Sequence, residues 1–354
     1  MRILVLGGLG KQGSVISESL IKQSPLNQVS IADNARDIKL MNGLHAFFPT
    51  NLGKYESILN VMGDDDFDLI VCAVPSVLGY NCVKAAVEKG ISMVDLSFAE
   101  EDLSVFDEEA KQKGISIIVD AGVAPGLSHL IAGRASMAGP DSVDILVGGI
   151  AQDRYEPYGG YTITWSVEDL VEEYIRPARI LVNGEEQVVD AMSGREIVDI
   201  VKDGELYRLE SFYTDGLRSL LINNNGVPNM SEKTMRWPGH LDAIKDELAI
   251  DKDMLIAHIK QDCKVNSPDV LVMKISSTHG ETTMVTLSDE KMSAMARTTA
   301  QACYTFASLI TSKTLNKTGV LPPELLADDD DVYRFVLDQM ADLGVVFSDK
   351  YPFM

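Results

Sequence analysis

Three glycines near the N-terminus have the spacing of a turn that binds the phosphates of a dinucleotide. The apolar run 3–6 leads into Gly8-Leu9-Gly10-Lys11-Gln12-Gly13, a G-x-G-x-x-G pattern, and a helix is expected to follow as far as Ile21. In such a turn the first glycine allows the bend, the second lets backbone approach a pyrophosphate, and the third lets the helix pack closely on the strand. The phosphate would lie at the helix N-terminus, where N–H groups and the helix dipole favour negative charge.

An acidic residue at the expected distance supports a cofactor site. A second apolar run, 29–32, ends in Asp33, which lies 20 residues beyond Gly13, as expected for the acid that binds the adenosine ribose. Glycines alone would also fit a structural turn, but the order of strand, glycines, helix, strand and acid favours a dinucleotide. Asp33 favours NAD over NADP because a carboxylate accepts the ribose hydroxyls and repels a 2′-phosphate, although Arg36 is a residue type that accommodates that phosphate.

Redox chemistry on a nicotinamide needs a proton acceptor, and three residues are candidates. Pro125 and Gly126 resemble a helix start, which puts His129 in a first turn, where the helix dipole disfavours imidazolium and leaves a neutral general base. The alternative, equally open, is a histidine hydrogen-bonded to backbone. Asp95 and Asp120 are the rival bases, and either would instead serve as a cap of a turn or helix.

Cationic side chains in the second half of the chain are candidates for binding a substrate carboxylate. They are Arg218, and Lys233 with Arg236. The latter two lie in a segment that ends in His240, which is a further candidate substrate contact. A planar guanidinium grips a carboxylate through two parallel hydrogen bonds. For each of these residues the alternative is an ordinary ion pair with an Asp or Glu.

Other kinds of catalytic site are not indicated by the sequence. We find no G-x-S-x-G elbow and no S-x-x-K set. The five histidines form no H-x-x-x-H and the four cysteines no C-x-x-C, so no metal site is predicted. The acidic runs at 64–66 and 328–331 lack the spacing of a calcium loop and are interpreted as solvated loop or helix-start charge.

Composition describes a soluble globular chain of 354 residues, long enough for two domains, with 45% hydrophobic and 24% charged residues. Its net charge of −22 argues against nucleic acid or an anionic membrane as a partner, because both would be repelled. We see no membrane-spanning stretch and no secretory leader. We therefore expect a cytoplasmic protein whose cysteines are reduced and mostly buried.

The elements that must position these residues alternate between strand and helix as far as Asp120, as in a parallel sheet covered on both faces. Strands are expected at 3–6, 29–32, 46–48, 67–74, 91–96 and 115–120, and helices at 55–62, 78–89 and 100–113. A doubly wound sheet binds its ligand at the carboxyl edge. The candidate cofactor loops there are Ala73-Val74-Pro75-Ser76, Asp95-Leu96-Ser97-Phe98 and Asp120-Ala121-Gly122-Val123-Ala124-Pro125-Gly126, although each residue also fits an ordinary strand-exit turn.

The pattern changes at about Val143. Antiparallel-looking strands are expected at 143–148, 161–165, 179–182, 206–209, 270–276 and 282–287, with one clear helix at 167–174. Helices at 293–314 and 332–340 are expected to return to the first domain as a covering layer. The predicted organisation is an α/β Rossmann domain at 1–125, an α+β substrate-binding and dimerisation domain at 126–290, and C-terminal helices at 291–354.

Several longer segments resemble the saccharopine dehydrogenase-like family, most closely its lysine 6-dehydrogenases. Besides the glycine turn and the loops at 95–98 and 122–126, these segments are Gly148-Gly149-Ile150, Thr164-Trp165-Ser166, Phe212-Tyr213-Thr214-Asp215-Gly216, Lys233-Thr234-Met235-Arg236-Trp237-Pro238-Gly239-His240 and Gly319-Val320-Leu321-Pro322-Pro323-Glu324. The resemblance covers nearly the whole chain. It implies the domain organisation above, a homodimer formed through the central domain, and a substrate site lined by Gly148, Gly149, Ser166 and Arg218.

Two departures from the saccharopine-forming members of this family bear on the substrate. They carry Asp where this chain has Ala124, and Tyr where it has Phe98. The loss of an acid and a hydroxyl that would face substrate favours a smaller amine such as L-lysine. We therefore expect NAD-dependent oxidative deamination of the 6-amino group of L-lysine. The products would be ammonia and 2-aminoadipate 6-semialdehyde, and the semialdehyde would cyclise. The alternatives are a saccharopine or carboxynorspermidine dehydrogenase acting on a secondary amine, and an NAD(H)-binding sensor without catalysis.

Overall fold

The computed structural model describes residues 1–34, 41–63, 67–202, 204–265 and 268–354, and these divide into two compact units. Unit 1 consists of Met1–Leu127 and Thr298–Met340, and unit 2 consists of Ser128–Arg297 and Ala341–Met354. The chain thus returns to unit 1 after completing most of unit 2. Arg36 and the acidic run 64–66 lie outside the described residues. In the described parts of the chain, no helix combines the length and apolar character needed to cross a membrane.

A seven-stranded parallel sheet forms the centre of unit 1, in the order β15-β6-β5-β4-β1-β2-β3. This confirms the Rossmann-type α/β fold predicted from the alternating pattern. The strands are β1 (Arg2–Leu6), β2 (Gln28–Asp33), β3 (Ala46–Pro49), β4 (Leu69–Cys72), β5 (Met93–Asp95), β6 (Ser116–Ile118) and β15 (Gly319–Leu321). The sequence did not predict β15, a strand of three residues that pairs with β6 from about 200 positions further along the chain.

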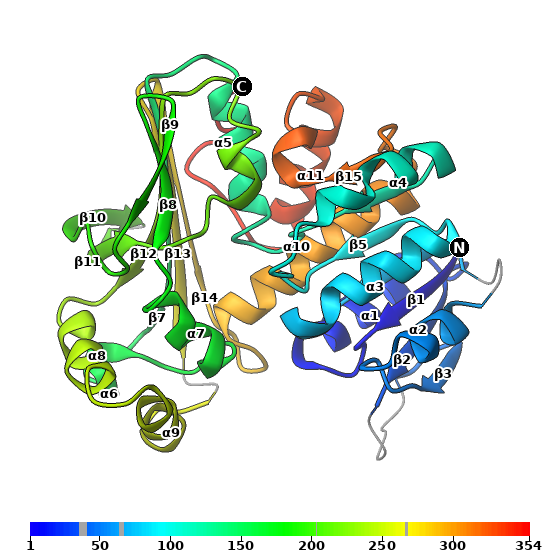
Figure 1. Ribbon diagram of the computed structural model, residues 1–354, viewed down its shortest axis with the longest axis horizontal. Helices are drawn as coiled ribbons and strands as arrows, with labels where there is room; N and C mark the ends of the chain where they lie inside the picture. Colours follow the sequence, from blue (N-terminus) through cyan, green and yellow to red (C-terminus); the bar gives the residue numbers. More distant parts are fainter. Residues whose placement is uncertain (35–40, 64–66, 203, 266–267) are drawn as a thin grey trace. The chain divides into compact units, whose positions relative to one another are not determined.

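Helices cover both faces of this sheet (Figure 1). The N-terminal ones are α1 (Lys11–Gln23), α2 (Tyr55–Met62), α3 (Ser76–Lys89), the 3-10 helix η1 (Leu103–Phe106) and α4 (Asp107–Lys113). The C-terminal ones are α10 (Ala294–Thr311), η3 (Pro323–Leu326) and α11 (Asp330–Asp342). Gln23 of α1 and Gln339 of α11 both donate to the hydroxyl of Ser308 in α10, at 3.0 and 3.1 Å. The C-terminal helices therefore pack back on the Rossmann unit, as predicted.

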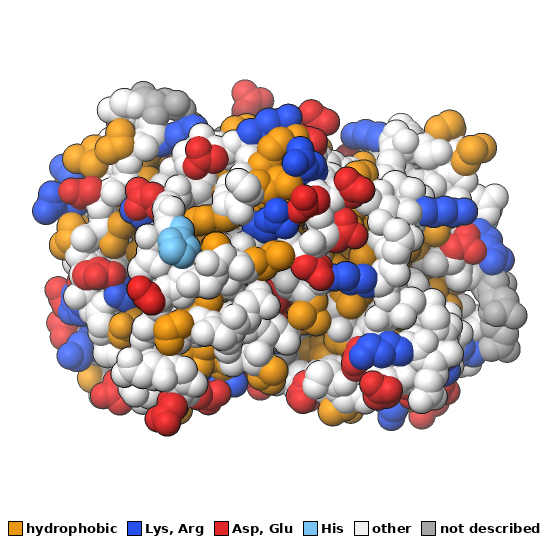
Figure 2. Space-filling view, turned by 90° about the horizontal axis from the view of Figure 1, so that it is seen from above, with side chains coloured by type: hydrophobic (Ala, Val, Ile, Leu, Met, Phe, Trp, Pro, Cys, Tyr) orange, Lys and Arg blue, Asp and Glu red, His pale blue; other side chains and the backbone are white. Residues whose placement is uncertain are grey.

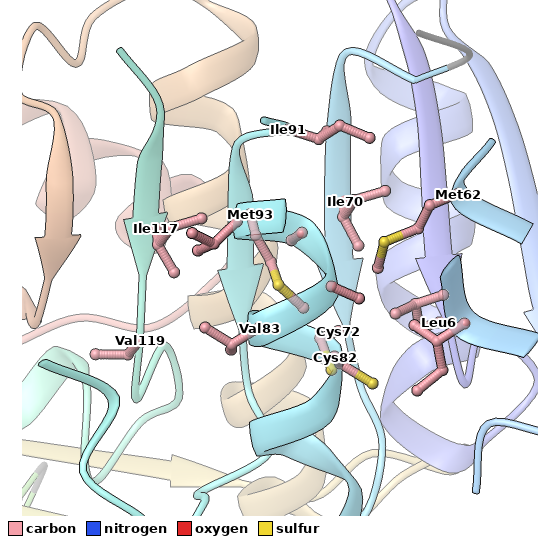
Figure 3. Close-up of a cluster of buried hydrophobic side chains, with 14 of the residues drawn as sticks. Leu6, Met62, Ile70, Cys72, Cys82, Val83, Ile91, Met93, Ile117 and Val119 are labelled. Carbon is pink, nitrogen blue, oxygen red and sulfur yellow. The ribbon is translucent and has the colours of Figure 1, made fainter. Parts of the chain in front are cut away.

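One large apolar cluster joins α2, α3 and α4 to their face of the sheet (Figure 3). Leu6, Ile70 and Met93 project from three strands toward Met62 and Val83 of the helices, and all are fully buried. Burying one such side chain stabilises the fold by about 1.5–3 kcal/mol. Because both faces of the sheet are covered, its strands read as continuous apolar runs, which is why the sequence revealed them.

Unit 2 is built on an eight-stranded mixed sheet with the path β10-β11-β12-β7-β13-β14, joined by a branch of β8 and β9. The strands are β7 (Ser142–Ala151), β8 (Ala178–Val182), β9 (Glu185–Val189), β10 (Glu196–Lys202), β11 (Glu205–Tyr213), β12 (Asn229–Arg236), β13 (Asp269–Ser277) and β14 (Gly280–Leu287). The helices are α5 (Leu127–Ser136), α6 (Pro157–Gly160), α7 (Val167–Glu173), η2 (Arg218–Leu221), α8 (His240–Leu248) and α9 (Lys252–Asp262). Only the β12–β7 pair is parallel among the described ladders of this sheet.

Three sequence predictions differ from the structure. The segment 161–165 is not a strand: Ile163 makes a single isolated bridge to Val265, and Tyr161 is buried among α7, α8 and α9. The helix expected at 100–113 begins only at Asp107, because Asp102 caps the preceding 3-10 helix through the Ser104 N–H at 2.9 Å. Finally, the sequence did not predict β9, β10, β12, α8 or α9.

Charged side chains are frequent on the surface, in line with the 24% of charged residues in the sequence. On the face shown in Figure 2, acidic and basic side chains are interspersed. The run 328–331 contributes Asp330 and Asp331 to the first turn of α11, where the helix dipole favours carboxylates, so its interpretation as helix-start charge is confirmed. All four cysteines are free thiols and buried, as predicted.

Candidate functional site

The glycine turn after β1 is shaped by two close contacts. Gly7 has φ +74°, and a Cβ there would lie 2.5 Å from the Ala73 carbonyl oxygen. A Cβ on Gly13 would lie 2.2 Å from the Gly7 carbonyl oxygen. Gly13 therefore lets α1 pack directly on the turn, as predicted. The tight bend, however, is made by Gly7 and not by Gly8. Gly8 has to be a glycine for another reason: a Cβ on it would lie 2.7 Å from the side chain of Ile31.

Gly10 differs from these glycines, because little in the protein requires it. Its backbone has φ −64°, and a Cβ would meet only the Gly7 oxygen, at 3.2 Å. Gly10 is exposed and is the N-cap residue of α1. An exposed glycine at a helix N-terminus leaves backbone N–H groups accessible to a phosphate.

Asp33 lies beside this turn. The Leu9 N–H donates to its carboxylate at 3.1 Å, although the two residues are 24 positions apart. The carboxylate is therefore next to the glycine backbone, where a ribose adjoining the pyrophosphate would lie. The cradle of small residues and the adjacent acid fit a dinucleotide: Gly8, Leu9, Gly10, Lys11, Gln12 and Gly13 would hold the phosphates, and Asp33 the ribose.

Backbone hydrogen bonds align the loops that follow the next strands at the same edge of the sheet. The Ala73 N–H donates to the Leu6 oxygen, that of Leu96 to the Cys72 oxygen, and that of Ala121 to the Asp95 oxygen, each at 2.9 Å. Ala73, Val74, Pro75, Leu96 and Val123 thus lie at the carboxyl edge in unit 1, where the sequence placed cofactor contacts.

Asp95 is completely enclosed at this edge. Its carboxylate accepts hydrogen bonds from the Ser97 hydroxyl at 2.8 Å and the Ser97 N–H at 3.2 Å. Burial raises the pKa of Asp95 to about 6, while the hydrogen bonds from Ser97 and Cys72 oppose the rise. Phe98 follows with φ +56°. The geometry makes Asp95 an anchor of the turn that presents Phe98, and its role as a base stays a prediction.

Asp120 begins a loop that folds tightly on itself. It has φ +52° and is 5% exposed. Gly126 lies so close to Gly122 that a Cβ would fall 1.9 Å from the Gly122 oxygen. The loop holds Val123 buried and leaves Ala124 partly exposed, before the cis bond to Pro125.

His129 is buried in unit 2, where both ring nitrogens have partners. Its Nε2 lies 3.1 Å from the Leu217 carbonyl oxygen and its Nδ1 lies 3.1 Å from the Ser128 hydroxyl. Since a carbonyl only accepts, the proton is on Nε2 and Nδ1 accepts from Ser128. Of the two alternatives left open by the sequence, the structure supports the histidine hydrogen-bonded to backbone.

The Leu217 carbonyl belongs to the turn 214–218, which carries Arg218. Asp215 accepts three hydrogen bonds from Arg179: from its backbone N–H at 3.1 Å, and from its Nε and Nη2 at 2.9 Å each. Arg218 is half-buried and has φ +46°. The ion pair on Asp215 and the His129 hydrogen bond hold Arg218 in this uncommon backbone conformation.

Arg236 and His240 occupy a different environment from Arg218. Arg236 is 5% exposed and pairs with Glu173 at 3.5 Å. His240 donates from Nδ1 to the Tyr158 carbonyl oxygen at 2.6 Å, so its Nε2 accepts from the Tyr174 hydroxyl at 2.8 Å. Burial and the nearby guanidinium lower the pKa of His240 to about 3. Both side chains thus contact protein groups inside unit 2, and their role in binding substrate stays a prediction.

The remaining predicted positions have structural reasons of their own. A Cβ on Gly148 would lie 2.6 Å from the Met235 carbonyl oxygen, and one on Gly149 would lie 3.0 Å from the Met295 methyl group. Ser166 is exposed and caps α7 by accepting from the Asp169 N–H at 3.3 Å. Lys233, weighed as a carboxylate ligand, is bonded to Glu196 at 2.6 Å. Among the described residues, no group of three or more His, Cys, Asp or Glu side chains could hold a metal ion.

Sequence reasoning missed the residues that support the turn 214–218. Arg179 and Glu232 lie 36 and 18 positions from their partners Asp215 and Thr214. The one sequence signal for these supporting residues was the mostly charged and polar composition of segment 231–236. In the structure this segment is buried along its whole length.

Comparisons with known proteins agree with this arrangement. The saccharopine dehydrogenase NADP binding domain matches residues 3–118, and the saccharopine dehydrogenase C-terminal domain matches residues 122–345. The mitochondrial alpha-aminoadipic semialdehyde synthase of Bos taurus is 26% identical over 258 residues, which cover 69% of this chain and 27% of that protein. Its counterpart in Mus musculus is 25% identical over 56% of this chain and 22% of that protein. The chain spans about a quarter of the length of these relatives.

The structure of saccharopine dehydrogenase (L-Glu forming) from Saccharomyces cerevisiae is similar throughout. It has a TM-score of 0.71 and 16% identity, and the match covers 98% of both chains. At this identity the likeness shows the fold, with its Rossmann-type unit, mixed-sheet unit and returning helices.

Gly10→Ala and Gly13→Ala should separate binding from folding in the glycine turn. Gly10→Ala is expected to lower Tm only slightly, through the poorer N-cap, and to raise the Kd for NADH about 10-fold or more, because the methyl group meets mainly the phosphate. Gly13→Ala should lower Tm as well, since overpacking costs about 1–3 kcal/mol. Thermal unfolding and NADH titration measure both effects. Equal loss of Tm in the two variants would contradict the assignment of Gly10.

Proposed function

Because the chain belongs to the saccharopine dehydrogenase family, we propose that it is an NAD-dependent dehydrogenase that deaminates an amino acid at its side-chain amine. The substrate we propose is L-lysine, oxidised at its 6-amino carbon to 2-aminoadipate 6-semialdehyde with release of ammonia. The observation that carries the proposal is the Asp33 carboxylate bonded across the glycine turn, since it makes this turn a dinucleotide site.

The choice of amine is supported by the loops at the carboxyl edge. Phe98 and Ala124 are both partly exposed there, in turns held by Asp95 and by the Gly122–Gly126 contact. They present a phenyl ring and a methyl group. Such side chains offer no hydrogen bond to the second carboxylate-bearing arm of a secondary amine, and leaving those polar groups unpaired would disfavour that larger substrate.

Arg218 would bind the substrate carboxylate, and the cofactor would supply the redox chemistry. When bound, NAD accepts hydride from the carbon that carries the amine. The protein must position that carbon, accept a proton from the ammonium group and admit one water for hydrolysis. We propose that one of the three candidate bases, His129, Asp95 or Asp120, accepts this proton.

A substrate panel tests this function. We expect L-lysine with NAD to give NADH and an equal amount of ammonia, measured by absorbance and by an enzymatic ammonia assay. Saccharopine and carboxynorspermidine should give neither. Turnover restricted to a secondary amine would overturn the substrate assignment. Tight NADH binding without turnover of any amine would indicate the sensor instead.

Removing the Arg218 guanidinium should weaken substrate binding. Arg218→Met is expected to raise KM for L-lysine about 10- to 100-fold, the effect of losing a charge-assisted hydrogen bond pair worth about 1.5–3 kcal/mol. Arg208→Met is the matched control, because Arg208 is exposed on β11 and pairs with Asp199 at 3.3 Å. Steady-state kinetics on both variants give the comparison. An unchanged KM in Arg218→Met would remove this residue from the substrate site.

Cofactor choice depends on Asp33. Asp33→Ser removes the negative charge that would repel a 2′-phosphate and keeps a hydroxyl for hydrogen bonding. We expect the ratio of kcat/KM for NADP to that for NAD to rise about 10-fold or more, equivalent to about 1.4 kcal/mol. Kinetics with both cofactors measure it, and an unchanged ratio would show that another residue selects between them.

A further inference from the structure

Two acids in the interior of unit 2 are connected by a chain of threonine hydroxyls. The Thr214 hydroxyl is hydrogen-bonded to Glu232 Oε2, and the Thr234 hydroxyl to Glu173 Oε1. The two hydroxyl oxygens lie 3.1 Å apart, which closes the chain between the carboxyl groups. Glu232 is 8% exposed, and the side chain of Glu173 is 15% exposed. The chain therefore has little access to water.

Counting hydrogens shows that this chain needs one more proton than two ionised carboxylates allow. It contains three oxygen–oxygen contacts within hydrogen-bonding reach, and all three can be hydrogen bonds at once only if each has a hydrogen between its atoms. Each threonine supplies a single hydrogen. If both hydroxyls donate to carboxylates, none is left for the contact between Thr214 and Thr234. If one carboxyl group is protonated, all three contacts are satisfied in a single direction.

We infer that Glu173 and Glu232 share one proton through Thr214 and Thr234, and that neutral Glu232 is a positioning residue for the turn that carries Arg218. Glu173 is the acid that faces Arg236, at 3.5 Å. The proton therefore resides on Glu232, which donates to Thr214, which donates to Thr234, which donates to Glu173.

The charged groups around Glu232 favour this distribution. Burial, together with the carboxylates of Glu173 and Asp215, raises the pKa of Glu232 to about 8, while the Thr214 hydrogen bond and Arg236 oppose the rise. The charged groups that act on it are Asp215 from the turn, whose partner is Arg179 from β8, Glu173 from α7, and Arg236 from β12.

Glu232 contacts the turn directly. The Thr214 N–H donates to the Glu232 carbonyl oxygen at 3.2 Å, and a Cβ on Gly216 would lie 2.6 Å from the Glu232 carboxyl carbon. The turn is thus in contact with the carboxyl group two residues before Arg218. Ionising Glu232 would remove a hydrogen from the chain and place a second negative charge beside Asp215, which would loosen the turn. The consequence for catalysis rests on the proposed role of Arg218 in binding the substrate carboxylate.

The shared proton predicts how stability depends on pH. An unfolded Glu titrates at a pKa of about 4.3, so between there and about pH 8 the folded protein holds a proton that the unfolded chain has lost. The free energy of unfolding therefore falls as pH rises through this window. Glu232→Gln keeps a permanent N–H donor toward Thr214 and has no proton to lose. Its Tm should match that of the native protein at pH 5 and exceed it by several degrees at pH 8.

The control is Glu205→Gln, which changes an exposed acid at the start of the neighbouring strand β11 and should show a Tm difference that does not vary with pH. Infrared spectroscopy of the native protein at pH 7 provides a second measurement: a protonated carboxyl band should be present and should disappear in Glu232→Gln. A Tm difference independent of pH, or no loss of the band, would overturn the shared proton. Both measurements need no substrate, so they stand apart from any failure of the proposed function.

Kinetics test the positioning role. KM for L-lysine in the native enzyme should rise above pH 8, while kcat changes less, and Glu232→Gln should abolish this rise. The same KM profile in both proteins would show that Glu232 does not position Arg218.

Discussion

The contact between Gly13 and the Gly7 carbonyl is the constraint on which unit 1 depends. At 2.2 Å from that oxygen no Cβ is possible, so α1 begins directly on the end of β1. This brings the helix N-terminus to the carboxyl edge of the sheet and next to Asp33. The loops after β4, β5 and β6 are then tied in succession to neighbouring strand ends by backbone hydrogen bonds. A dinucleotide site thus results from close backbone packing, with one carboxylate added.

In unit 2 the polar interior holds one cationic residue, Arg218, in an uncommon backbone conformation. The turn before Arg218 is supported by three side chains from different elements: Arg179 from β8, Glu232 from β12 and His129 from α5. Each contacts the turn through a group that would be costly to leave unpaired inside the protein. The polarity of this interior therefore serves to position the turn, and the apolar cluster around Tyr161 and Phe212 provides the packing.

Much of unit 1 could be predicted because its signals are local. Strands buried on both faces are apolar without interruption, and glycines end the helices at Gly90 and Gly114, where φ is positive. Unit 2 was harder for a specific reason. Strand β12 buries Ser231, Glu232, Lys233 and Thr234, so it lacks the alternation of apolar and polar residues by which a strand is recognised. The prediction for the segment 161–165 failed in the opposite way, since its aromatic residues suit a strand, but Tyr161 packs among helices and Trp165 is exposed.

The sequence by itself determined the dinucleotide turn, its acid and the fold class, because these depend on residues that are neighbours or lie one strand–helix–strand unit apart. Only the tertiary structure decided what the isolated polar residues do. His129 contacts a carbonyl 88 positions away, and Arg236 and His240 contact groups from α7 and α6. Burial, and the partners that folding brings together, decide whether a side chain can reach substrate and whether it can gain or lose a proton. The spacing of residues along the chain indicates neither its burial nor its partners.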